Sequence, residues 1–466
     1  MIKRIINKIK RGFSKPRKSV DKRISITSGY FIPPEVRRSN NGLINFPSEL
    51  LTPYRFDVMA KYIYGKYRSK GSSSKWHVDL YSEHLKVWNN YVEQGRHTKQ
   101  EKDSEDKFIS CFNDLLDSIK TDGFNEEISR IWINNNGHII NGGHRLAGCL
   151  LYDKKPACEV HDSAKGQANC SSYYFLNKKD NVAKGLSVDY ADSMALQYAR
   201  LKFNTYIVTL FPSAVGKDEI VRQALLEYGM IVYEKAVDFH NNGPFNFVRT
   251  MYQGEKWVGT WDDEFKGTNG KVEPCFCNPG PVKIFLFECK SHELLGEYKD
   301  KIRDIYKIGK HSVHINDSHE ETLRLAEIVF NKNTIHFMNN SRLKYFDIFT
   351  KYFAQFINWI KQSGVCSDDI CVDGSAVLSA YGVRDCRDID FLYHDDYIDT
   401  ESKTFSCHNE EGRYYPVTKD EIIYNPSNHF YYRGIKFASL EMVKQMKSKR
   451  SEEKDKKDLL LIKKVI

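Results

Sequence analysis

The feature that restricts the fold of this chain most is a pair of apolar segments joined by a glycine turn, between Ile370 and Leu392. Residues 370–372 are apolar and partly β-branched, as a buried strand requires. Gly374-Ser375 predicts a tight turn, residues 376–387 a short helix, and residues 388–392 a second strand. The spacing therefore favours a strand-turn-helix-strand unit.

The side chains of this unit suit a nucleotide and a divalent cation. Gly374 has no Cβ, so the backbone there can approach a ligand closely. Ser375 stands at the expected start of the helix, where free N–H groups and the helix dipole favour phosphate. Asp388 and Asp390 are two residues apart and would point to the same face of a strand. Two carboxylates beside a phosphate-binding turn predict a site for Mg²⁺ and a nucleoside triphosphate.

Gly374-Ser375 and Asp388-Ile389-Asp390 resemble the motif of the polymerase-β-like nucleotidyltransferase superfamily. The resemblance implies a nucleotidyltransferase fold for residues 341–466. It implies that Asp388 and Asp390 are catalytic and hold Mg²⁺, and that Gly374 and Ser375 hold the triphosphate of CTP or ATP. Arg387 or Arg384 would neutralise charge on the leaving pyrophosphate. The alternative is a Gly-Ser turn followed by two exposed aspartates without a catalytic role.

Members of that superfamily usually take a third carboxylate from a later strand. Asp420 and Glu421, which precede the apolar run 422–424, are candidates for it. The tail from Gly434 to Glu441, with the charged residues 447–450 and 454–458, resembles the closing segment of small members of the superfamily.

A second glycine motif lies near residue 142. Residues 131–133 and 138–140 predict two strands joined by a tight hairpin turn. Gly142-Gly143-His144-Arg145 follows and opens an apolar helix. The glycines allow close approach of a ligand at the helix N-terminus, and Arg145 offers a fork that matches phosphate.

This second motif is similar to that of the ParB/sulfiredoxin-like superfamily, over roughly residues 50–165. The resemblance implies that Gly142, Gly143, His144 and Arg145 bind nucleotide phosphates. Gly143 stands where sulfiredoxins have a reactive cysteine, so sulfinate reduction is not expected. No helix-turn-helix reader is evident either. The functions that remain open for this unit are a kinase, a phosphotransferase and a nucleotide-binding scaffold. The alternative is a purely structural Gly-Gly turn with a surface arginine.

Between these motifs, residues 204–340 predict strands at 205–210, 230–233 and 281–287 and a helix at 217–228. With Ile302-Arg303 and His314-Ile315-Asn316-Asp317-Ser318, this order resembles nucleoside diphosphate kinase and implies a ferredoxin-like fold. His314 would take the place of the phosphorylated histidine, a chemically sensible nucleophile. The Lys-Pro-Asp segment of that family is Phe211-Pro212-Ser213 here, so its lysine is missing. The alternative is that Asp317 or Ser318 caps the following helix and His314 lies in the core.

The charge of the chain is concentrated at its start. Residues 1–23 hold ten Lys and Arg against one Asp, a formal charge of +9 that equals the net charge of all 466 residues. The rest is formally neutral, so a DNA-binding face and a nucleic-acid partner are not expected. Residues 1–13 predict a basic amphipathic helix that could lie on an anionic membrane, or else a solvated tail, and residues 14–40 a linker.

Cysteine usage and hydropathy point to the cytoplasm, with membrane association through the first residues. The 11 cysteines are scattered without a pair of Cys-x-x-Cys motifs, which favours reduced thiols over zinc. No apolar run approaches the ~18 residues of a membrane span, and the start lacks the pattern of a signal peptide.

Together these features predict a multidomain α+β protein. The expected divisions are a helix and linker (1–40), a ParB/sulfiredoxin-like nucleotide-binding domain (41–200), a degenerate diphosphate-kinase-like domain (201–340) and a nucleotidyltransferase-like domain (341–466). The leading hypothesis is an Mg²⁺-dependent nucleotidyltransferase, bifunctional with a small-molecule kinase, that acts on a sugar phosphate or polyol phosphate. By analogy it would belong to bacterial surface-polysaccharide synthesis. A protein-modifying toxin and a non-enzymatic nucleotide-binding or DNA-partitioning protein of the ParB-like type are the alternatives.

Overall fold

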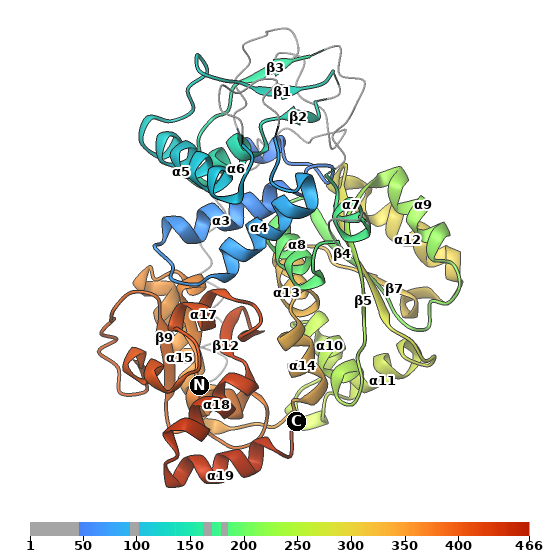
Figure 1. The fold of residues 1–466 in the computed structure, drawn as a ribbon. Coiled ribbons are helices and arrows are strands. Elements are labelled where there is room, and N and C mark those ends of the chain that lie inside the picture. The colour runs from blue at the N-terminus through green and yellow to red at the C-terminus, as the bar shows by residue number, and fades with distance from the viewer. Residues whose placement is uncertain (1–45, 94–101, 136, 162–169, 179–184, 466) are drawn as a thin grey trace.

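The structure is a computed structural model that describes residues 46–93, 102–135, 137–161, 170–178 and 185–465. The expected basic helix at 1–13 and linker at 14–40 lie outside these residues. Helices and three mixed or antiparallel sheets make up the described chain, which confirms an α+β protein with several units (Figure 1). In the described residues, no helix has the length and apolar character needed to cross a membrane.

The N-terminal unit is mainly helical and carries one small sheet. Its helices are α3 (Val58–Ser69), α4 (Trp76–Asn89), α5 (Glu105–Asp122), α6 (Gly143–Tyr152), α7 (Ser172–Asn177) and α8 (Val188–Leu201). Its strands are β1 (Ile131–Ile133), β2 (Ile139–Asn141) and β3 (Cys158–Val160), in the order β2-β1-β3. β1 and β2 are antiparallel, which confirms the predicted hairpin before the Gly-Gly motif.

The middle unit is built on an antiparallel sheet in the order β5-β6-β4-β7. Its strands are β4 (Thr205–Leu210), β5 (Gly229–Val237), β6 (Val282–Cys289) and β7 (Val313–Ile315). Its helices are α9 (Asp218–Tyr228), α10 (Gly243–Met251), α11 (Lys266–Cys275), α12 (Leu295–Tyr306), α13 (His319–Val329) and α14 (Lys332–Asn340).

Both faces of the middle sheet are buried, as the apolar run of β6 requires. Phe285 and Phe287 pack in one core with residues of α9 and α12, while Ile284 and Leu286 face the larger core that α10 and α13 share. The predicted strand 205–210 and helix 217–228 are confirmed.

The C-terminal unit contains the strand-turn-helix-strand segment from which the sequence argument starts. Its helices are α15 (Asp347–Ser363), α16 (Gly374–Ala380), α17 (Lys419–Tyr424), α18 (Leu440–Arg450) and α19 (Glu453–Ile462). Its strands are β8 (Ile370–Val372), β9 (Ile389–Tyr393), β10 (Phe405–Cys407), β11 (His429–Tyr432) and β12 (Ile435–Ala438), in the order β10-β9-β8-β12-β11.

Two expectations for this unit are corrected. Helix α16 ends at Ala380 rather than near residue 387, because Gly382 takes a left-handed φ of +72° and turns the chain away. Asp420 and Glu421 lie in helix α17 and not on a later strand, where the superfamily usually has its third carboxylate, because the hydroxyl of Thr418 caps the N–H of Glu421 and starts a helix there.

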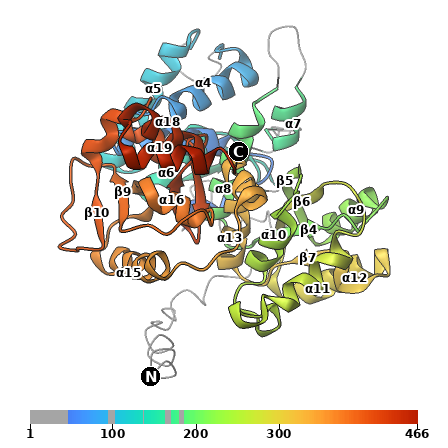
Figure 2. The ribbon, with the colours of Figure 1, turned by 90° about the horizontal axis from the view of Figure 1, so that it is seen from below.

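The three units share half-buried charges where they meet. Asp368, just before β8, lies 2.7 Å from Nζ of Lys66 on α3 and 3.4 Å from the guanidinium of Arg200 on α8. Arg200 also reaches Glu327 on α13 at 3.3 Å. Figure 2 shows α8 and α13 between the middle sheet and the C-terminal unit. This network ties one residue of the C-terminal unit to both other units.

Candidate functional site

Three carboxylates gather where β8 and β9 run side by side. β9 carries Asp390, and Asp388 immediately precedes this strand. Asp373 follows β8 directly, and its N–H donates to the carbonyl of Asp390 at 2.8 Å. Asp373 and Asp388 both lie close enough to Asp390 to raise the pKa of its carboxyl. The pairing of the two strands therefore brings together the two predicted metal ligands and a third acid, Asp373.

Gly374 is in contact with this carboxylate group. Its φ of +61° lies in the left-handed region, and a Cβ built on it would lie 3.1 Å from Oδ2 of Asp390. Any other residue here would strain the turn and crowd the aspartate. Ser375 is half-buried in the first turn of α16, next to Gly374. The predicted glycine turn and the predicted aspartates thus form one site.

The electrostatics of Asp390 are those of a carboxylate that needs a positive partner. Burial, and then the charges of Asp373 and Asp388, raise its pKa to about 7. Its Oδ1 is buried and accepts no hydrogen bond from the described residues. Nε2 of His408, at the end of β10, lies 3.2 Å from this oxygen and forms an ion pair with it when the imidazole is protonated. Asp373 accepts a hydrogen bond from the hydroxyl of Tyr415 at 2.8 Å, and burial raises its pKa.

These observations fit a hard divalent cation. A buried carboxylate oxygen that accepts no hydrogen bond needs another partner, and a bound cation would be one. Mg²⁺ in turn prefers carboxylate oxygens as ligands, and this cluster of acids offers them. Within the residues that the structure describes, no three His, Cys, Asp or Glu side chains already form a metal-binding arrangement. Asp388 and Asp390 would be the protein ligands, with His408 beside them.

No family model, curated protein or solved structure matches this chain.

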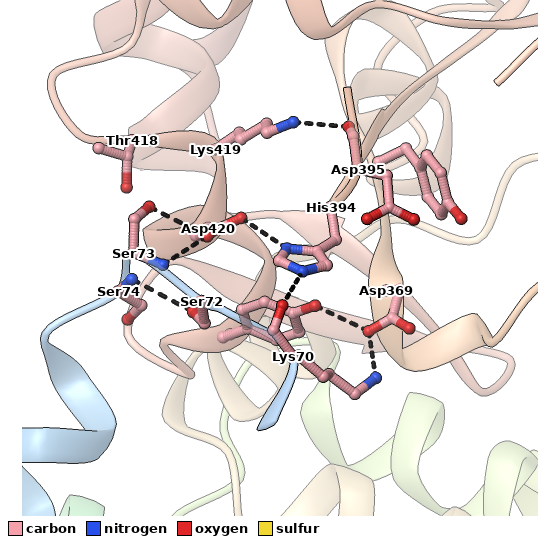
Figure 3. Close-up of polar contacts among 12 residues, drawn as sticks. Lys70, Ser72, Ser73, Ser74, Asp369, His394, Asp395, Thr418, Lys419 and Asp420 are labelled. Atoms are coloured by element: carbon pink, nitrogen blue, oxygen red, sulfur yellow. Dashed lines mark hydrogen bonds and ion pairs between the residues drawn. The ribbon is translucent and has the colours of Figure 1, made fainter. Parts of the chain in front are cut away.

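Asp420 and Glu421, the candidates for a third carboxylate, have other partners. Figure 3 shows those of Asp420. Oδ2 of Asp420 accepts the N–H of Ser73 at 2.7 Å and its hydroxyl at 3.0 Å, and Oδ1 lies 3.0 Å from Nδ1 of His394. Glu421 accepts the hydroxyl of Ser74 at 2.9 Å. Both acids therefore fasten the loop between α3 and α4 to the C-terminal unit. The side chain that β10 brings to Asp390 is His408, which the sequence argument missed. Apolar and polar residues alternate over 405–408, a pattern typical of a strand, and this pattern could have placed Ser406 and His408 on one face.

Cationic residues approach the site from one helix and one loop. Lys447 and Arg450, both on α18, lie near enough to Asp373 to lower its pKa, although burial outweighs them. Both already have acidic partners, since Lys447 lies 2.9 Å from Asp458 and Arg450 lies 2.7 Å from Glu411. Arg384 is held by Asp458, whose carboxylate accepts Nε at 2.6 Å and one terminal nitrogen at 2.7 Å. Arg387 is exposed. Of the two arginines predicted to neutralise pyrophosphate, Arg384 therefore already has an acidic partner.

The Gly-Gly motif of the N-terminal unit faces inward. Gly142 caps α6 with a φ of +112°, and a Cβ on Gly143 would lie 2.3 Å from the guanidinium of Arg55. Nε2 of His144 lies 2.9 Å from the hydroxyl of Tyr81, and desolvation of the half-buried imidazole lowers its pKa. Arg145 donates to the carbonyl of Arg130 and to Oδ1 of Asn141. The predicted phosphate ligands thus lie together, but His144 and Arg145 have partners within the chain.

Beneath this motif lies a buried ionic cluster that the sequence did not indicate. The guanidinium of Arg55 binds Asp57 through two nitrogens at 2.8 and 2.9 Å, and Nζ of Lys61 lies 2.5 Å from the same carboxylate. The two cations hold the pKa of Asp57 far below its usual value despite burial. Arg55 and Asp57 precede helix α3, whereas Lys61 lies within it. Their spacing therefore matches no sequence motif that would predict the cluster.

His314 lies on β7, in the middle sheet and apart from both glycine motifs. Burial and nearby Lys299 lower its pKa to about 3, so the imidazole is neutral. Its ring stands edge-on to Tyr252, with 4.7 Å between centroids. The hydroxyl of Ser318 accepts the N–H of Glu321 and caps α13, which confirms the predicted cap. The site residues named from the sequence therefore lie in three units, each with its own sheet.

Proposed function

We propose that the protein is an Mg²⁺-dependent nucleotidyltransferase whose active site is the carboxylate cluster beside Gly374. The observation that carries the proposal is the buried Oδ1 of Asp390, which accepts no hydrogen bond from the described residues and has only the ring nitrogen of His408 beside it, at 3.2 Å. Burial and two neighbouring acids raise the pKa of this carboxyl to about 7. Such a group is costly unless a cation binds it.

The residues would divide the work as follows. Asp388 and Asp390 would hold the metal, and the backbone at Gly374 and Ser375 would bind the phosphates. Bound Mg²⁺ would neutralise charge on the triphosphate. An oxygen of the acceptor would attack the α-phosphorus while the bond to pyrophosphate breaks. His408, 3.2 Å from Asp390, is placed to take the proton of the attacking oxygen. Arg387, whose side chain is exposed, would favour the pyrophosphate.

The two other units would serve the same chemistry. The N-terminal unit is proposed to be ParB/sulfiredoxin-like and to phosphorylate or hold the acceptor, a sugar phosphate or polyol phosphate. The strand order β5-β6-β4-β7 of the middle unit supports a ferredoxin-like domain. CTP or ATP would be the nucleotide, in a cytoplasmic enzyme of bacterial surface-polysaccharide synthesis.

The second candidate is a nucleotide-binding regulatory or DNA-partitioning protein built on the N-terminal unit. The double glycine turn over Arg55, Asp57 and Lys61 favours it as a binding scaffold. Salt-dependent retention of DNA by protein lacking residues 1–40 would support this candidate, since the remaining chain is formally neutral.

The test is pyrophosphate release with Mg²⁺, each of the four nucleoside triphosphates, and a pool of sugar phosphates and polyols. Wild-type protein should release pyrophosphate, and Asp388→Ala/Asp390→Ala should not. Asp385→Ala is the matched control, because Asp385 accepts the N–H groups of Ile348 and Phe349 and serves the fold of the same unit.

Two other results would contradict the proposal. Pyrophosphate release that survives the double substitution would place the chemistry elsewhere. Release of nucleoside diphosphate that survives the double substitution but is lost in Arg145→Ala would make the N-terminal unit a kinase and the primary active site.

A further inference from the structure

A histidine fastens the α3–α4 loop (residues 70–75) of the N-terminal unit to the C-terminal unit. His394 directly follows β9, and its imidazole lies between two oxygen atoms (Figure 3). Nδ1 lies 3.0 Å from Oδ1 of Asp420 on α17. Nε2 lies 2.7 Å from the carbonyl oxygen of Lys70, the residue directly after α3. The imidazole therefore bridges two units of the protein.

Both of these oxygen atoms are acceptors, which decides the protonation state that fits the contact. A backbone carbonyl and an ionised carboxylate have no proton to donate. A neutral imidazole carries one N–H and one unprotonated nitrogen, so it would place a lone pair against one of the two oxygens. The imidazolium carries two N–H groups and satisfies both. The arrangement of the two oxygens therefore favours the charged form of His394.

The acid that faces the imidazole directly is Asp420. Lys70 and Asp369 also lie beside it, but they form an ion pair with each other, so their charges offset. The ring of Tyr424 stands edge-on to His394 with 5.3 Å between centroids, and its hydroxyl donates to Asp369 at 2.8 Å. The imidazolium would therefore be balanced by the carboxylate of Asp420.

Other charged groups near the loop are engaged or keep one charge state. Lys419, on α17, donates to the carbonyl of Asp395 at 2.6 Å. Burial lowers the pKa of His77, on α4, to about 4, so its imidazole is neutral near neutral pH. Histidine is the side chain that ordinarily changes charge in the physiological range, so His394 can switch this contact.

A second contact joins the same two units and stays charged. Asp368 lies 2.7 Å from Nζ of Lys66 on α3. Burial would raise the pKa of Asp368, but the charges of Arg200 and Lys66 hold it well below its ordinary value. This contact therefore keeps α3 attached to the C-terminal unit over the range in which a histidine titrates.

We propose that His394 is a pH-sensitive latch, which holds the α3–α4 loop on the C-terminal unit while its imidazole is doubly protonated and releases the loop when the imidazole becomes neutral. The side chain of His394 is 13% exposed, so protons can reach it from solvent. The latch keeps both hydrogen bonds at acid pH and loses one of them as the pH rises. This proposal does not depend on nucleotidyl transfer at Asp388 and Asp390.

Hydrogen exchange of the full chain tests the latch through the amides of the loop. The N–H of Ser73 donates to Asp420 at 2.7 Å, and the N–H of Lys75 donates to Glu421 at 2.6 Å. Exchange is followed by mass spectrometry at pH 5.5 and pH 7.5, and each rate is divided by the intrinsic rate at that pH. Protection of residues 71–76 should be about tenfold greater at pH 5.5, as expected for one charge-assisted hydrogen bond. Equal protection at the two pH values would overturn the proposal.

A pair of variants assigns the change to His394. His394→Gln removes the titrating group, so its protection should differ by less than about twofold between the two pH values. His311→Gln is the matched control, because His311 is exposed and lies in the middle unit, and it should keep the tenfold change. Asp390, with a pKa of about 7, and Lys436, whose pKa burial lowers to about 8, are unchanged in both variants. A pH dependence that survives in His394→Gln would belong to such a group and overturn the proposal.

Asp420→Asn tests the latch without removal of the histidine. Asparagine keeps an oxygen that can accept the N–H of Ser73, but it has no negative charge to favour the imidazolium. The difference in protection between the two pH values should therefore fall to about threefold or less. A tenfold difference retained in folded Asp420→Asn would overturn the proposal.

Discussion

A Cβ built on Gly374 would lie 3.1 Å from Oδ2 of Asp390, although the two residues are 16 positions apart in the chain. The turn that would bind phosphate and the acid that would bind metal are thus in direct contact. Their relative position is set by the pairing of β8 with β9, which places Val372 opposite Phe391.

The first prediction concerns this contact. Gly374→Ala should abolish pyrophosphate release. It should also lower the free energy of unfolding by about 1–2 kcal/mol, because the Cβ of alanine is strained at a left-handed φ. Gly364→Ala is the matched control, because Gly364 has a φ of +74° with no atom within 4 Å of its Cβ. It should show the same loss of stability by urea denaturation and normal turnover. Equal turnover in both variants would remove Gly374 from the site.

The second prediction concerns the effect of Asp390 on the free energy of unfolding, which should change with pH. Its pKa of about 7 in the folded protein exceeds the ordinary 3.8, so the folded state binds more protons than the unfolded state between these values. Stability from this group is therefore full below pH 4 and falls as the pH rises to 7. Asp390→Asn should match wild type near pH 4 and be more stable at pH 8, by at most about 4 kcal/mol. A difference that does not change with pH would refute the assignment.

The third prediction concerns the cation. Mg²⁺ and the proton compete for Asp390, so the affinity for Mg²⁺ should rise up to about tenfold per pH unit below 7 and level off above it. At saturating Mg²⁺ and pH 8, the melting temperature should rise by about 1 °C per kcal/mol of binding free energy, the scale expected for 466 residues. Asp388→Ala/Asp390→Ala should lose both effects in differential scanning fluorimetry. A melting shift that persists in this variant would point to a different metal site.

The fourth prediction separates structure from chemistry at Asp420. Its buried carboxylate accepts two hydrogen bonds from Ser73 and lies beside His394, so Asp420→Ala should cost about 2–3 kcal/mol of stability. Activity per folded molecule should stay near that of wild type. Ser73→Ala, which removes only the hydroxyl, should cost about 1 kcal/mol. A loss of turnover in folded Asp420→Ala would restore this residue as a metal ligand.

The sequence predicted the local elements of the site because their signals are local. The apolar run before Gly374, the glycine turn and the Asp-x-Asp spacing each depend on a few neighbouring residues, and β8, α16 and β9 follow from them. The same holds for strand 205–210 and for the hairpin before Gly142.

Residues that reach the site across strands or units escaped the sequence argument. His408 is next to Asp390 only because β10 runs parallel to β9, with Ser406 opposite Asp390. Arg55, Asp57 and Lys61 form their cluster under Gly143 through the packing of α3 on α6, and no periodicity encodes that contact. Asp420 was a plausible metal ligand until the loop at Ser73 was seen to occupy it.

The bonds from Ser73 and Ser74 to Asp420 and Glu421 join positions 347 residues apart. A ribosome makes the loop between α3 and α4 long before it makes the acids that hold it. During synthesis this loop therefore lacks its hydrogen-bond partners until about nine-tenths of the chain has emerged. Incompletely folded surfaces are prone to misassembly during that period. Removal of the C-terminal residues from Thr418 onward would consequently loosen the loop between α3 and α4, although that loop lies more than 300 residues earlier in the chain.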